Sequence, residues 1–380
     1  MKELEQILAL WSQLEARNEA AVLATVVKTS GSSYRLPGAR LLLTRTGQRV
    51  GSVSGGCLED DLVKRAWWLT DNGPVIRRYD TTPEGEIAAE YGLGCNGIIY
   101  VLLERISTGT ADTLLLIQQV HELRRSAAIA HVIEPVGAAG QKFVIDPDGL
   151  VRHDSTRTVP REALERQTRS ALAEGQSHIA RIEDTEIFAE TLTPPLRLLV
   201  FGAGDDAVPL VTLAKFLGWE VFVFDGRAHY ARRDKFPQAD GVSVRAPGSG
   251  GSDLPVDPWT AAVLMSHSYS QDCEMLKELS DRKLFYVGVL GPRKRAAQML
   301  RDAGLDDVID SPAVHSPMGL DIGADGPEQV ALSVVAEIQA TVNKRRGGFL
   351  RERSGPIHAG DPHSDNEQVR KPWIRSIVCA

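Results

Sequence analysis

The stretch LRLLVFGAGDDAVPLVTLAKFLGWEVFVFDGR, residues 196–227, decides the fold of the second half of this chain. Its apolar start predicts a buried strand, and a glycine-containing turn leads from that strand into a helix. A second apolar strand ends at Asp225, about 20 residues beyond the turn, where an acidic side chain can accept a hydrogen bond from a ribose hydroxyl. This order of strand, glycine turn, helix and acid-terminated strand is typical of a nucleotide-binding Rossmann unit.

Two glycines shape the turn between the first strand and the helix. Gly202 permits a tight turn, Gly204 lets the backbone approach a pyrophosphate, and Ala207 provides the third small residue of the motif. The pyrophosphate of such a ligand would sit on the positive N-terminus of the helix. The sequence therefore predicts that Gly202 and Gly204, together with Asp225, bind a nucleotide or phosphate group.

Two carboxylates complicate this interpretation. Asp205 and Asp206 stand at the start of the helix, where they would repel a pyrophosphate unless they point away or bind a metal ion or a ribose. The alternative is that they cap the helix and complement its dipole. Both interpretations remain open from the sequence.

Strands and helices alternate through the rest of this half, which indicates a doubly wound parallel sheet covered on both faces. The strand candidates are 196–204, 219–227, 241–246, 260–267 and 283–291, and the helix candidates include 207–218, 293–304 and 326–342. Ligands of such sheets bind beyond the carboxyl ends of the strands. The loops at that edge offer Asp225, Arg227, Ser266, His267, Asp272, Arg293 and Lys294, and the polar loop 315–325 could cover them.

His267 and Arg293 are the weaker candidates for cofactor contacts in this crevice. A histidine at the end of a strand more commonly makes an ordinary hydrogen bond than binds a ligand. Arg293 begins a run of three basic residues, which could equally be the solvated face of a helix.

The first half of the chain predicts an α+β domain. We expect helices over 2–16, 57–70, 111–125 and 160–174, strands over 21–29 and 97–106, a hairpin over 39–55, and a three-stranded meander between 128 and 154. Pro194 and Pro195 mark the expected boundary, which gives domains of 1–193 and 194–343. Residues 344–380 are poor in apolar side chains and are expected to form a mobile tail.

Two glycine-cysteine loops are the most distinctive feature of this first half. SVSGGCLED (52–60) places Cys57 at a predicted helix start, where backbone N–H groups and the helix dipole stabilise a thiolate. YGLGCNGII (91–99) places Cys95 in a turn that enters a strand. Both thiols are candidate cofactor or metal contacts, and the alternative is that both are small buried hydrophobes. With 38 positions between only two thiols, a structural zinc site is disfavoured.

The other candidate residues of the first half lie in the loop that precedes the hairpin. Arg35 and Arg40 could meet an anionic ligand there, although surface arginines are usually just solvated. The remaining cysteines, Cys273 and Cys379, are expected to be incidental, one in a helix and the other in the tail.

The composition narrows the class of protein. With 380 residues the chain is long enough for two domains, and its 43% hydrophobic and 24% charged residues are ordinary for a soluble globular protein. A formal net charge of -7 argues against a nucleic-acid partner. No apolar run approaches the roughly 18 residues that suggest a membrane span, and the acidic N-terminus does not resemble a signal peptide. Four cysteines do not make a disulfide framework, so we expect free thiols in the reducing cytoplasm.

These segments together resemble the XdhC/CoxI family, the accessory proteins of xanthine dehydrogenase and related molybdenum hydroxylases. The resemblance covers nearly the whole chain before the tail. It rests on GSSYRLPGARLLL (31–43), GSVSGGCLEDDLV (51–63), YGLGCNGIIYVLLE (91–104), the stretch 200–227, LMSHSYSQD (264–272), YVGVLGPRKR (286–295) and HSPMGLDIGADGPEQVALSVVAEI (315–338). One departure is Asp205, where many members of the family have histidine.

The resemblance implies a chaperone, not a turnover enzyme. Such a protein binds molybdenum cofactor as molybdopterin or its dinucleotide form, assists its sulfuration and delivers it to an apo molybdenum hydroxylase. A cysteine desulfurase and a second copy of the chain, in a homodimer, are further partners to consider. The candidate cofactor contacts are Cys57, Cys95, Gly202, Gly204, Asp225, His267 and Arg293, with both cysteines as candidate metal contacts because soft thiolates suit this metal and sulfur transfer.

Two other classes of function remain open. An NAD(P)-dependent oxidoreductase would use the glycine turn and Asp225, but the cysteine loops would then have no role in its activity. A nucleotide-sensing interaction protein with an inert N-terminal domain would bind no molybdenum.

Overall fold

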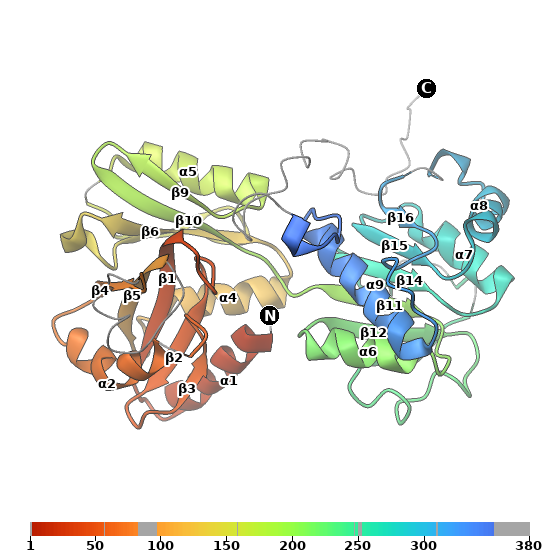
Figure 1. Ribbon diagram of the computed structural model, residues 1–380, viewed down its shortest axis with the longest axis horizontal. Coiled ribbons are helices and arrows are strands. Elements are labelled where there is room, and N and C mark those ends of the chain that lie inside the picture. The colour runs from red at the N-terminus through yellow and green to blue at the C-terminus, as the bar shows by residue number, and fades with distance from the viewer. Residues whose placement is uncertain are drawn as a thin grey trace. The chain divides into compact units, whose positions relative to one another are not determined.

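The computed structural model describes residues 2–56, 58–82, 97–157, 159–246, 248–249, 253–308 and 311–352 (Figure 1). The chain divides into two compact units, Glu3–Pro194 and a second unit that begins at Pro195. The first unit contains two five-stranded sheets, and the second contains one six-stranded sheet. The fold class expected from the sequence, an α+β domain followed by a Rossmann-like parallel-sheet domain, is confirmed.

The first sheet of the N-terminal unit has β1 (Ala21–Gly31) at its centre. Its order is β3-β2-β1-β5-β4, and every neighbouring pair is antiparallel. The other strands are β2 (Arg40–Thr44), β3 (Arg49–Gly51), β4 (Val75–Asp80) and β5 (Gly97–Ile106). β1 is a continuous apolar run because both of its faces are covered: Leu23 belongs to one core cluster, while Val22 and Ala24 belong to another.

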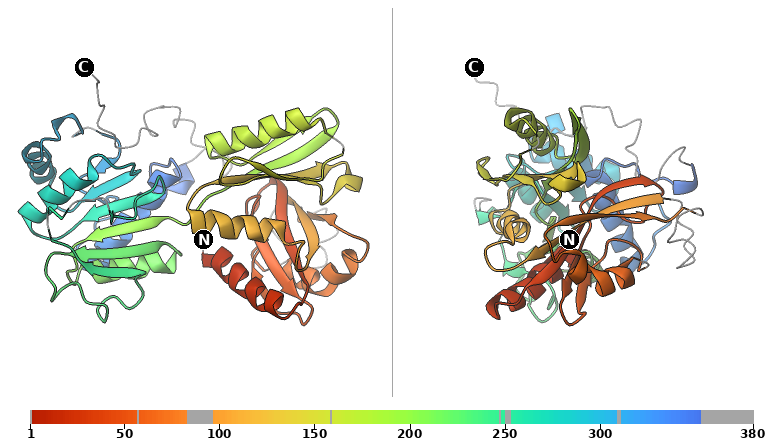
Figure 2. Two further views of the ribbon diagram at one scale, coloured as in Figure 1. Left: turned by 180° about the vertical axis from the view of Figure 1, so that it is seen from behind. Right: turned by 90° about the vertical axis from the view of Figure 1, so that its left-hand side faces the viewer.

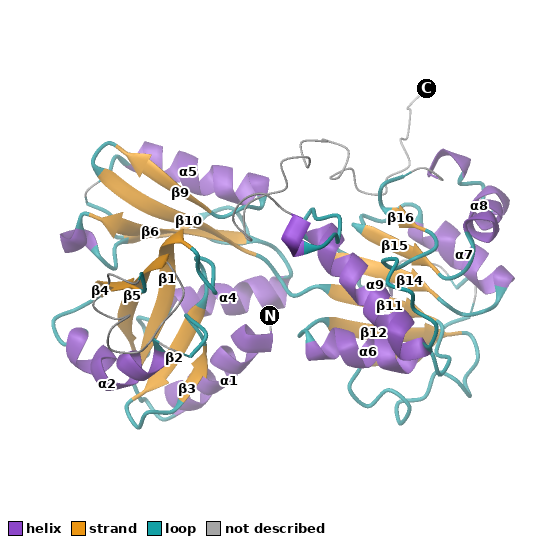
Figure 3. Cartoon of the chain, viewed as in Figure 1, coloured by secondary structure: helices purple, strands orange, loops and turns teal. Residues whose placement is uncertain are grey.

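The second sheet of this unit is also antiparallel, with the order β8-β7-β6-β10-β9. Figure 3 labels three of its strands, β6, β10 and β9. Its strands are β6 (Ala127–Glu134), β7 (Lys142–Ile145), β8 (Val151–Asp154), β9 (His178–Ile182) and β10 (Thr185–Leu192), and η1 (Val136–Ala138) lies between β6 and β7. The expected meander is thus confirmed as β6, β7 and β8.

Among the described residues of this unit, four α-helices cover the two sheets. They are α1 (Lys2–Ala16), α2 (Glu59–Leu69), α4 (Asp112–Leu123) and α5 (Arg161–Glu174), each within a few residues of its predicted range. α1 and α4 pack into one core with β1 and β6, α2 packs against the opposite face of the first sheet, and α5 packs against β6, β7 and β10. The buried stripe of α1, which includes Ile7, Trp11 and Leu14, follows the helical period seen in the sequence.

Three strands described in the N-terminal unit, β4, β9 and β10, were not predicted from the sequence. β4 and β9 are largely half-buried or exposed, so neither shows a continuous apolar run. β10 is central and mostly buried, but Glu186 and Glu190 interrupt its apolar pattern. Both carboxylates have cationic partners on the other sheet, which local sequence does not reveal.

The C-terminal unit contains a six-stranded parallel sheet with the order β13-β12-β11-β14-β15-β16. Its strands are β11 (Arg197–Phe201), β12 (Glu220–Asp225), β13 (Gly241–Val244), β14 (Thr260–Leu264), β15 (Tyr286–Val289) and β16 (Val314–His315). Its helices are α6 (Ala207–Phe216), α7 (Tyr269–Leu279), α8 (Arg293–Asp302) and α9 (Pro327–Val342), with short helices η3 (Asp306–Val308) and η4 (Leu350–Glu352).

Helices cover both faces of this sheet, as the alternating pattern predicts. α6 and α9 share a core with inward-facing residues of β11, β12 and β14 and lie on the near side of the sheet in Figure 1. α7 and α8 share the second core and are seen on the opposite face when the molecule is viewed from behind (Figure 2). No helix among the described residues is long and apolar enough to cross a membrane.

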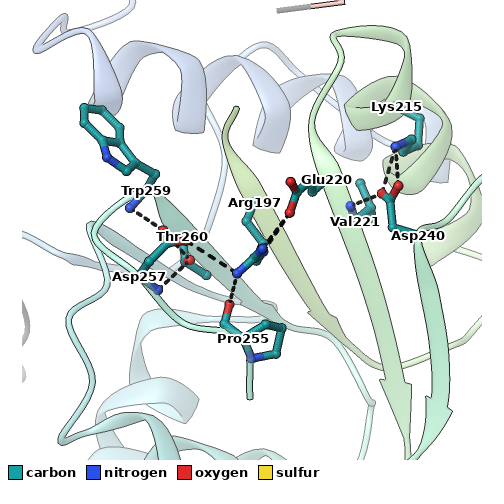
Figure 4. A network of polar contacts seen from close by, with 9 residues as sticks. All are labelled: Arg197, Lys215, Glu220, Val221, Asp240, Pro255, Asp257, Trp259 and Thr260. Atoms are coloured by element: carbon teal, nitrogen blue, oxygen red, sulfur yellow. Dashed lines mark hydrogen bonds and ion pairs between the residues drawn. The ribbon is translucent and has the colours of Figure 1, made fainter. Parts of the chain in front are cut away.

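The amino edge of the sheet is fixed by a polar network (Figure 4). Arg197, at the start of β11, donates to Oε2 of Glu220 at 2.7 and 3.0 Å and to the carbonyl of Pro255 at 2.7 Å. Oδ2 of Asp240 accepts from the N–H of Val221 at 2.7 Å. These bonds tie the amino ends of β11 and β12 to the segments that precede β13 and β14.

Candidate functional site

The order of the parallel sheet reverses at β11. The chain passes from β11 to β12 and β13 on one side, and β14 and β15 are added on the other side. In open parallel sheets, ligands bind beyond the carboxyl ends of the strands at such a switch point. The loops that leave the strands there are residues 202–206 after β11 and 265–268 after β14. We take the space between these loops as the candidate site of the C-terminal unit.

The two glycines of the turn have different neighbours. Gly202 has a φ of 125°, and a Cβ atom there would collide with the backbone of Met265 and Ser266. This glycine is therefore required by the close approach of the loops that follow β11 and β14. At Gly204, a Cβ atom would instead collide with Oδ1 of Asp206. The Asp206 carboxylate thus fills the space that the absent side chain leaves open.

Asp225 ends β12 as expected, but none of its side chain is exposed (0%). Its Oδ2 accepts from the N–H of Ala203 and from Nη2 of Arg227, both at 2.9 Å. Its Oδ1 accepts from the backbone N–H and Nε of Arg227 at 2.9 and 2.8 Å. Burial favours the neutral form, yet these hydrogen bonds hold the pKa of Asp225 below its usual value. Asp225 therefore positions the turn and Arg227, and a ribose could reach it only if one of these bonds opened.

The carboxylates at the start of α6 have separate cationic partners. Nζ of Lys235 lies 2.7 Å from Oδ1 of Asp205 and donates to the carbonyl of Ala203 at 2.8 Å. The hydrogen bond from Lys235 lowers the pKa of Asp205. Oδ2 of Asp206 lies 2.7 Å from Nε2 of His267. Asp206 occupies the N-cap position of α6, but its side chain makes no capping bond, so the capping interpretation is wrong for this residue.

His267 bridges the two loops of the switch point. Its side chain is 61% exposed and its backbone is left-handed, with a φ of 58°. The loop that carries it is braced by Ser266, whose hydroxyl donates to Oδ1 of Asp272 at 2.5 Å and accepts from the N–H of Ser268 at 3.1 Å. Arg227 also donates to the carbonyl of Ser266 at 3.1 Å. Burial raises the pKa of Asp272 above its usual value.

A pocket at this edge includes Gly202, Asp225, Ser266 and Asp272 in its lining. Arg293 lines a different pocket, beside Ser311 and Ser316. The structure thus gathers Gly202, Asp225 and the loop of His267 around one crevice and places Arg293 at another. Lys235 contacts the turn after β11 through Asp205 and the carbonyl of Ala203. The sequence offered no signal for it, because it follows Asp225 in an irregular segment.

In the N-terminal unit, glycine-containing loops leave one end of the first sheet. Antiparallel pairing brings the ends of β1, β3 and β4 beside the starts of β2 and β5. The connections at this end are 32–39, 52–58 and 81–96, of which 57 and 83–96 lie outside the described residues. Gly31 pairs with Gly97, and a Cβ at Gly97 would collide with the carbonyl of Ser32. A Cβ at Gly55 would lie 3.7 Å from the ring of Tyr34. The loop 32–39 therefore contacts Gly55, in the segment of Cys57, and Gly97, which follows the segment of Cys95.

A buried glutamate, Glu59, organises the loop that precedes Cys57. Its Oε1 accepts from the hydroxyl of Ser52 at 2.8 Å and from the N–H groups of Val53 and Ser54 at 3.0 and 2.8 Å. Its Oε2 accepts from the Ser54 hydroxyl and from the N–H of Gly56 at 3.0 Å. Burial opposes ionisation, but these bonds, led by those from Ser54, lower the pKa of Glu59. No motif in the sequence singled out Glu59, whose partners in the loop become apparent only in the folded chain.

The expectation that Arg40 meets an anionic ligand is wrong. Its side chain is 2% exposed and makes a bidentate ion pair with Glu190, at 2.8 and 2.5 Å. Arg35 is paired with Glu3. Both arginines therefore form ion pairs within the N-terminal unit.

The candidate contacts Cys57 and Cys95 lie outside the described residues. Cys273 is buried in α7, where burial raises the pKa of its thiol, as fits an incidental cysteine. Among the residues that the structure describes, no group of three or more His, Cys, Asp or Glu side chains is arranged to hold a metal ion.

Comparisons with known proteins agree with this architecture. Residues 198–338 match a family model described as the XdhC Rossmann domain, and residues 14–80 match one described as the XdhC and CoxI family. A Bacillus subtilis (strain 168) protein, named as a probable subunit of xanthine dehydrogenase, is 34% identical over 334 residues, which cover 85% of this chain and 93% of that protein. The Escherichia coli (strain K12) protein named "Molybdenum cofactor insertion chaperone PaoD" is 24% identical over 84% of this chain and 83% of its own length.

A solved structure extends this likeness to three dimensions. A crystal structure titled as a xanthine dehydrogenase from Bacillus halodurans matches 89% of this chain and 96% of its own chain, with 29% identity and a TM-score of 0.74. Fold and site together define a two-domain protein whose second domain is of the Rossmann type. The chain belongs to the XdhC and CoxI family.

Proposed function

We propose that this protein is a chaperone that binds molybdenum cofactor as its cargo and delivers it to a molybdenum hydroxylase of the xanthine dehydrogenase type. The relatives named above support the association with this cofactor and with such an enzyme. The observation that carries the proposal is the meeting of glycine-containing loops at one end of the first sheet, where Tyr34 and Ser32 contact glycines that adjoin the two cysteine segments.

The chemistry of the cargo fits the residue types at this end of the sheet. Molybdenum cofactor combines a metal bound by soft sulfur ligands, a pterin and a phosphate group. Thiolates from Cys57 and Cys95 would suit the metal and the transfer of sulfur to it. Tyr34 is 70% exposed and offers an aromatic face for the pterin. Glu59 holds the loop before Cys57 in one conformation, so less entropy is lost when the cargo binds.

The finer parts of the proposal concern sulfuration and partners. Sulfuration of the cargo would require a sulfur donor, for which a cysteine desulfurase is the candidate. We also propose that the protein works in the cytoplasm, where its thiols stay reduced, and that it forms a homodimer. Within domain 1–193, the two thiols would hold the metal end of the cargo.

The test replaces each cysteine by serine, with Cys273→Ala as the matched control that removes a thiol elsewhere. Each variant is co-expressed with the cofactor biosynthesis proteins, and bound molybdenum and pterin are measured by metal analysis and fluorescence. Cys57→Ser or Cys95→Ser should lose most of the bound molybdenum and fail to activate the apo-hydroxylase, while Cys273→Ala keeps both functions. Full loading and delivery by the double variant Cys57→Ser/Cys95→Ser would contradict the proposed role of these thiols.

The second candidate function is an NAD(P)-dependent oxidoreductase. The glycine turn at the switch point of a parallel sheet favours it, but both Asp225 oxygens already accept from Ala203 and Arg227. Calorimetric titration with NAD(H) and NADP(H), followed by a search for hydride transfer, distinguishes the candidates. Tight nicotinamide binding by a protein that never carries molybdenum would favour the oxidoreductase, and nucleotide binding alone would favour a nucleotide-sensing protein.

A further inference from the structure

The N-terminus of α6 is a favourable position for an anion, and in this chain the carboxylate of Asp206 lies there. No hydrogen bond among the described residues engages the N–H groups of Gly204, Asp205 or Asp206. Such free N–H groups, with the positive end of the helix dipole, attract anions. The carboxylate of Asp206 lies over Gly204, where the second glycine of a Rossmann turn normally admits a phosphate.

His267 holds this carboxylate in place from across the switch point. Its Nε2 lies 2.7 Å from Oδ2 of Asp206, while Oδ1 of Asp206 is the atom above Gly204. The neighbouring carboxylate, Asp205, is 99% exposed and is paired with Lys235. Of these two acids, therefore, only Asp206 blocks the approach to Gly204.

A second and independent feature of the crevice indicates a ligand. The side chain of Asp272 is 2% exposed and lines the pocket beside Gly202 and Asp225. Its Oδ2 has no hydrogen-bond partner among the described residues, and its nearest cation is Nη2 of Arg295 at 3.6 Å. A buried carboxylate oxygen without a donor is costly, and the hydroxyl of a bound ligand would satisfy it. Both features lie at the switch point, because Gly202, two residues before Gly204 in the same turn, lines the pocket together with Asp272.

We propose that Asp206 is a built-in competitor in a nucleotide site: its carboxylate occupies the phosphate position above Gly204, and a phosphate-bearing ligand binds by displacing it from His267. The ligand phosphate then takes the contacts of the displaced carboxylate, with His267 and the free N–H groups of the turn. This inference concerns only phosphate recognition and does not depend on the molybdenum cargo.

The test is calorimetric titration of the full chain with inorganic pyrophosphate, ADP and NAD⁺. Asp206→Ala should bind all three about five- to tenfold more tightly than the unmodified chain, as expected when a like charge is removed at about 4 Å in a water-exposed site. Asp205→Ala is the matched control, because it removes the same charge one residue away, and it should change the affinity about twofold or less. If NAD⁺ or ADP binds more tightly than pyrophosphate, a nucleotide is the source of the phosphate; equal affinities mean that phosphate alone is recognised.

A third variant distinguishes displacement from a general change in charge. In the Asp206→Ala background, the additional change His267→Ala should weaken pyrophosphate binding, because the freed imidazole has become a ligand contact. The melting temperatures of all variants establish that they are folded. Unchanged or weaker binding by Asp206→Ala, an equal gain in Asp205→Ala, or no binding of any probe to any folded variant would overturn the proposal. None of these measurements involves molybdenum cofactor, so their failure is distinct from failure of the proposed function.

Discussion

The substitution Glu59→Gln measures how strongly one buried carboxylate fixes the loop before Cys57. In the protein, Oε1 of Glu59 accepts three hydrogen bonds and Oε2 accepts two. The glutamine amide oxygen can replace Oε1, but its NH₂ group would face two donors at the position of Oε2. The bond from the N–H of Gly56 is lost, and the Ser54 hydroxyl must turn away from its present acceptor.

The magnitude follows from these contacts. A hydrogen bond to a charged group contributes about 1.5–3 kcal/mol, and the remaining bonds lose the assistance of the charge. We therefore expect Glu59→Gln to lower the free energy of unfolding of the N-terminal unit by about 2–4 kcal/mol at pH 7. The matched control is Asp60→Asn, since Asp60 is next to Glu59 in α2 but is exposed, and its ion pair is with the exposed Arg49. That change should cost less than about 1 kcal/mol.

The pH dependence gives a second check on the same reasoning. The pKa of Glu59 is lower in the folded protein than its ordinary value of 4.5, so its stabilising effect is complete above that value. The effect is lost as the pH falls from there through the folded pKa, since a protonated Glu59 resembles glutamine. Urea unfolding at neutral pH and below pH 4.5 measures the difference between the two proteins. A cost under about 0.5 kcal/mol at pH 7, or one that grows as the pH falls, would refute the proposed role of the carboxylate.

Two further predictions concern buried contacts whose partners are far apart in the sequence. Arg40→Ala leaves Glu190 buried without its bidentate partner and should destabilise the N-terminal unit by about 3–5 kcal/mol in urea unfolding, whereas Arg40→Met combined with Glu190→Leu should recover most of that loss. The exposed Arg49→Ala is its control, and an equal cost there would argue against a special role for the buried pair. Gly202→Ala should cost about 2 kcal/mol or more in the C-terminal unit, because a Cβ there would collide with Met265 and the backbone has a positive φ. Gly73→Ala, with a φ of 115° and no atom within 4 Å, measures the backbone strain alone, so similar costs for both glycines would show that the collision is unimportant.

Much of the Rossmann unit could be predicted because its signals are local. The five longer strands of that sheet are short apolar runs, and the glycine turn stands between β11 and α6 in the expected place. β16 has only two residues, Val314 and His315, and too short a run to detect. In the N-terminal unit, α1 and β5 agree with their predicted ranges because helical periodicity and a continuous apolar run are visible without a partner.

The candidate site was only partly predictable, because residue type does not specify orientation. The sequence located the turn, Asp225 and His267 at the carboxyl edge of the sheet. It did not reveal that Arg227 and Ala203 occupy the oxygens of Asp225, since hydrogen-bond partners are set by how the loops pack.

The sequence by itself determined the fold class, the position of the phosphate-type turn and the family to which the chain belongs, because periodicity and short glycine motifs are written along consecutive residues. Only the tertiary structure decided that Arg40 is buried against Glu190, that β10 is a central strand, and that Asp206 points toward His267. The physical reason is common to these cases: a charged side chain is stable in a buried or crowded position only if a partner from another element meets it there. Such partners come together through folding and cannot be identified from neighbouring residues.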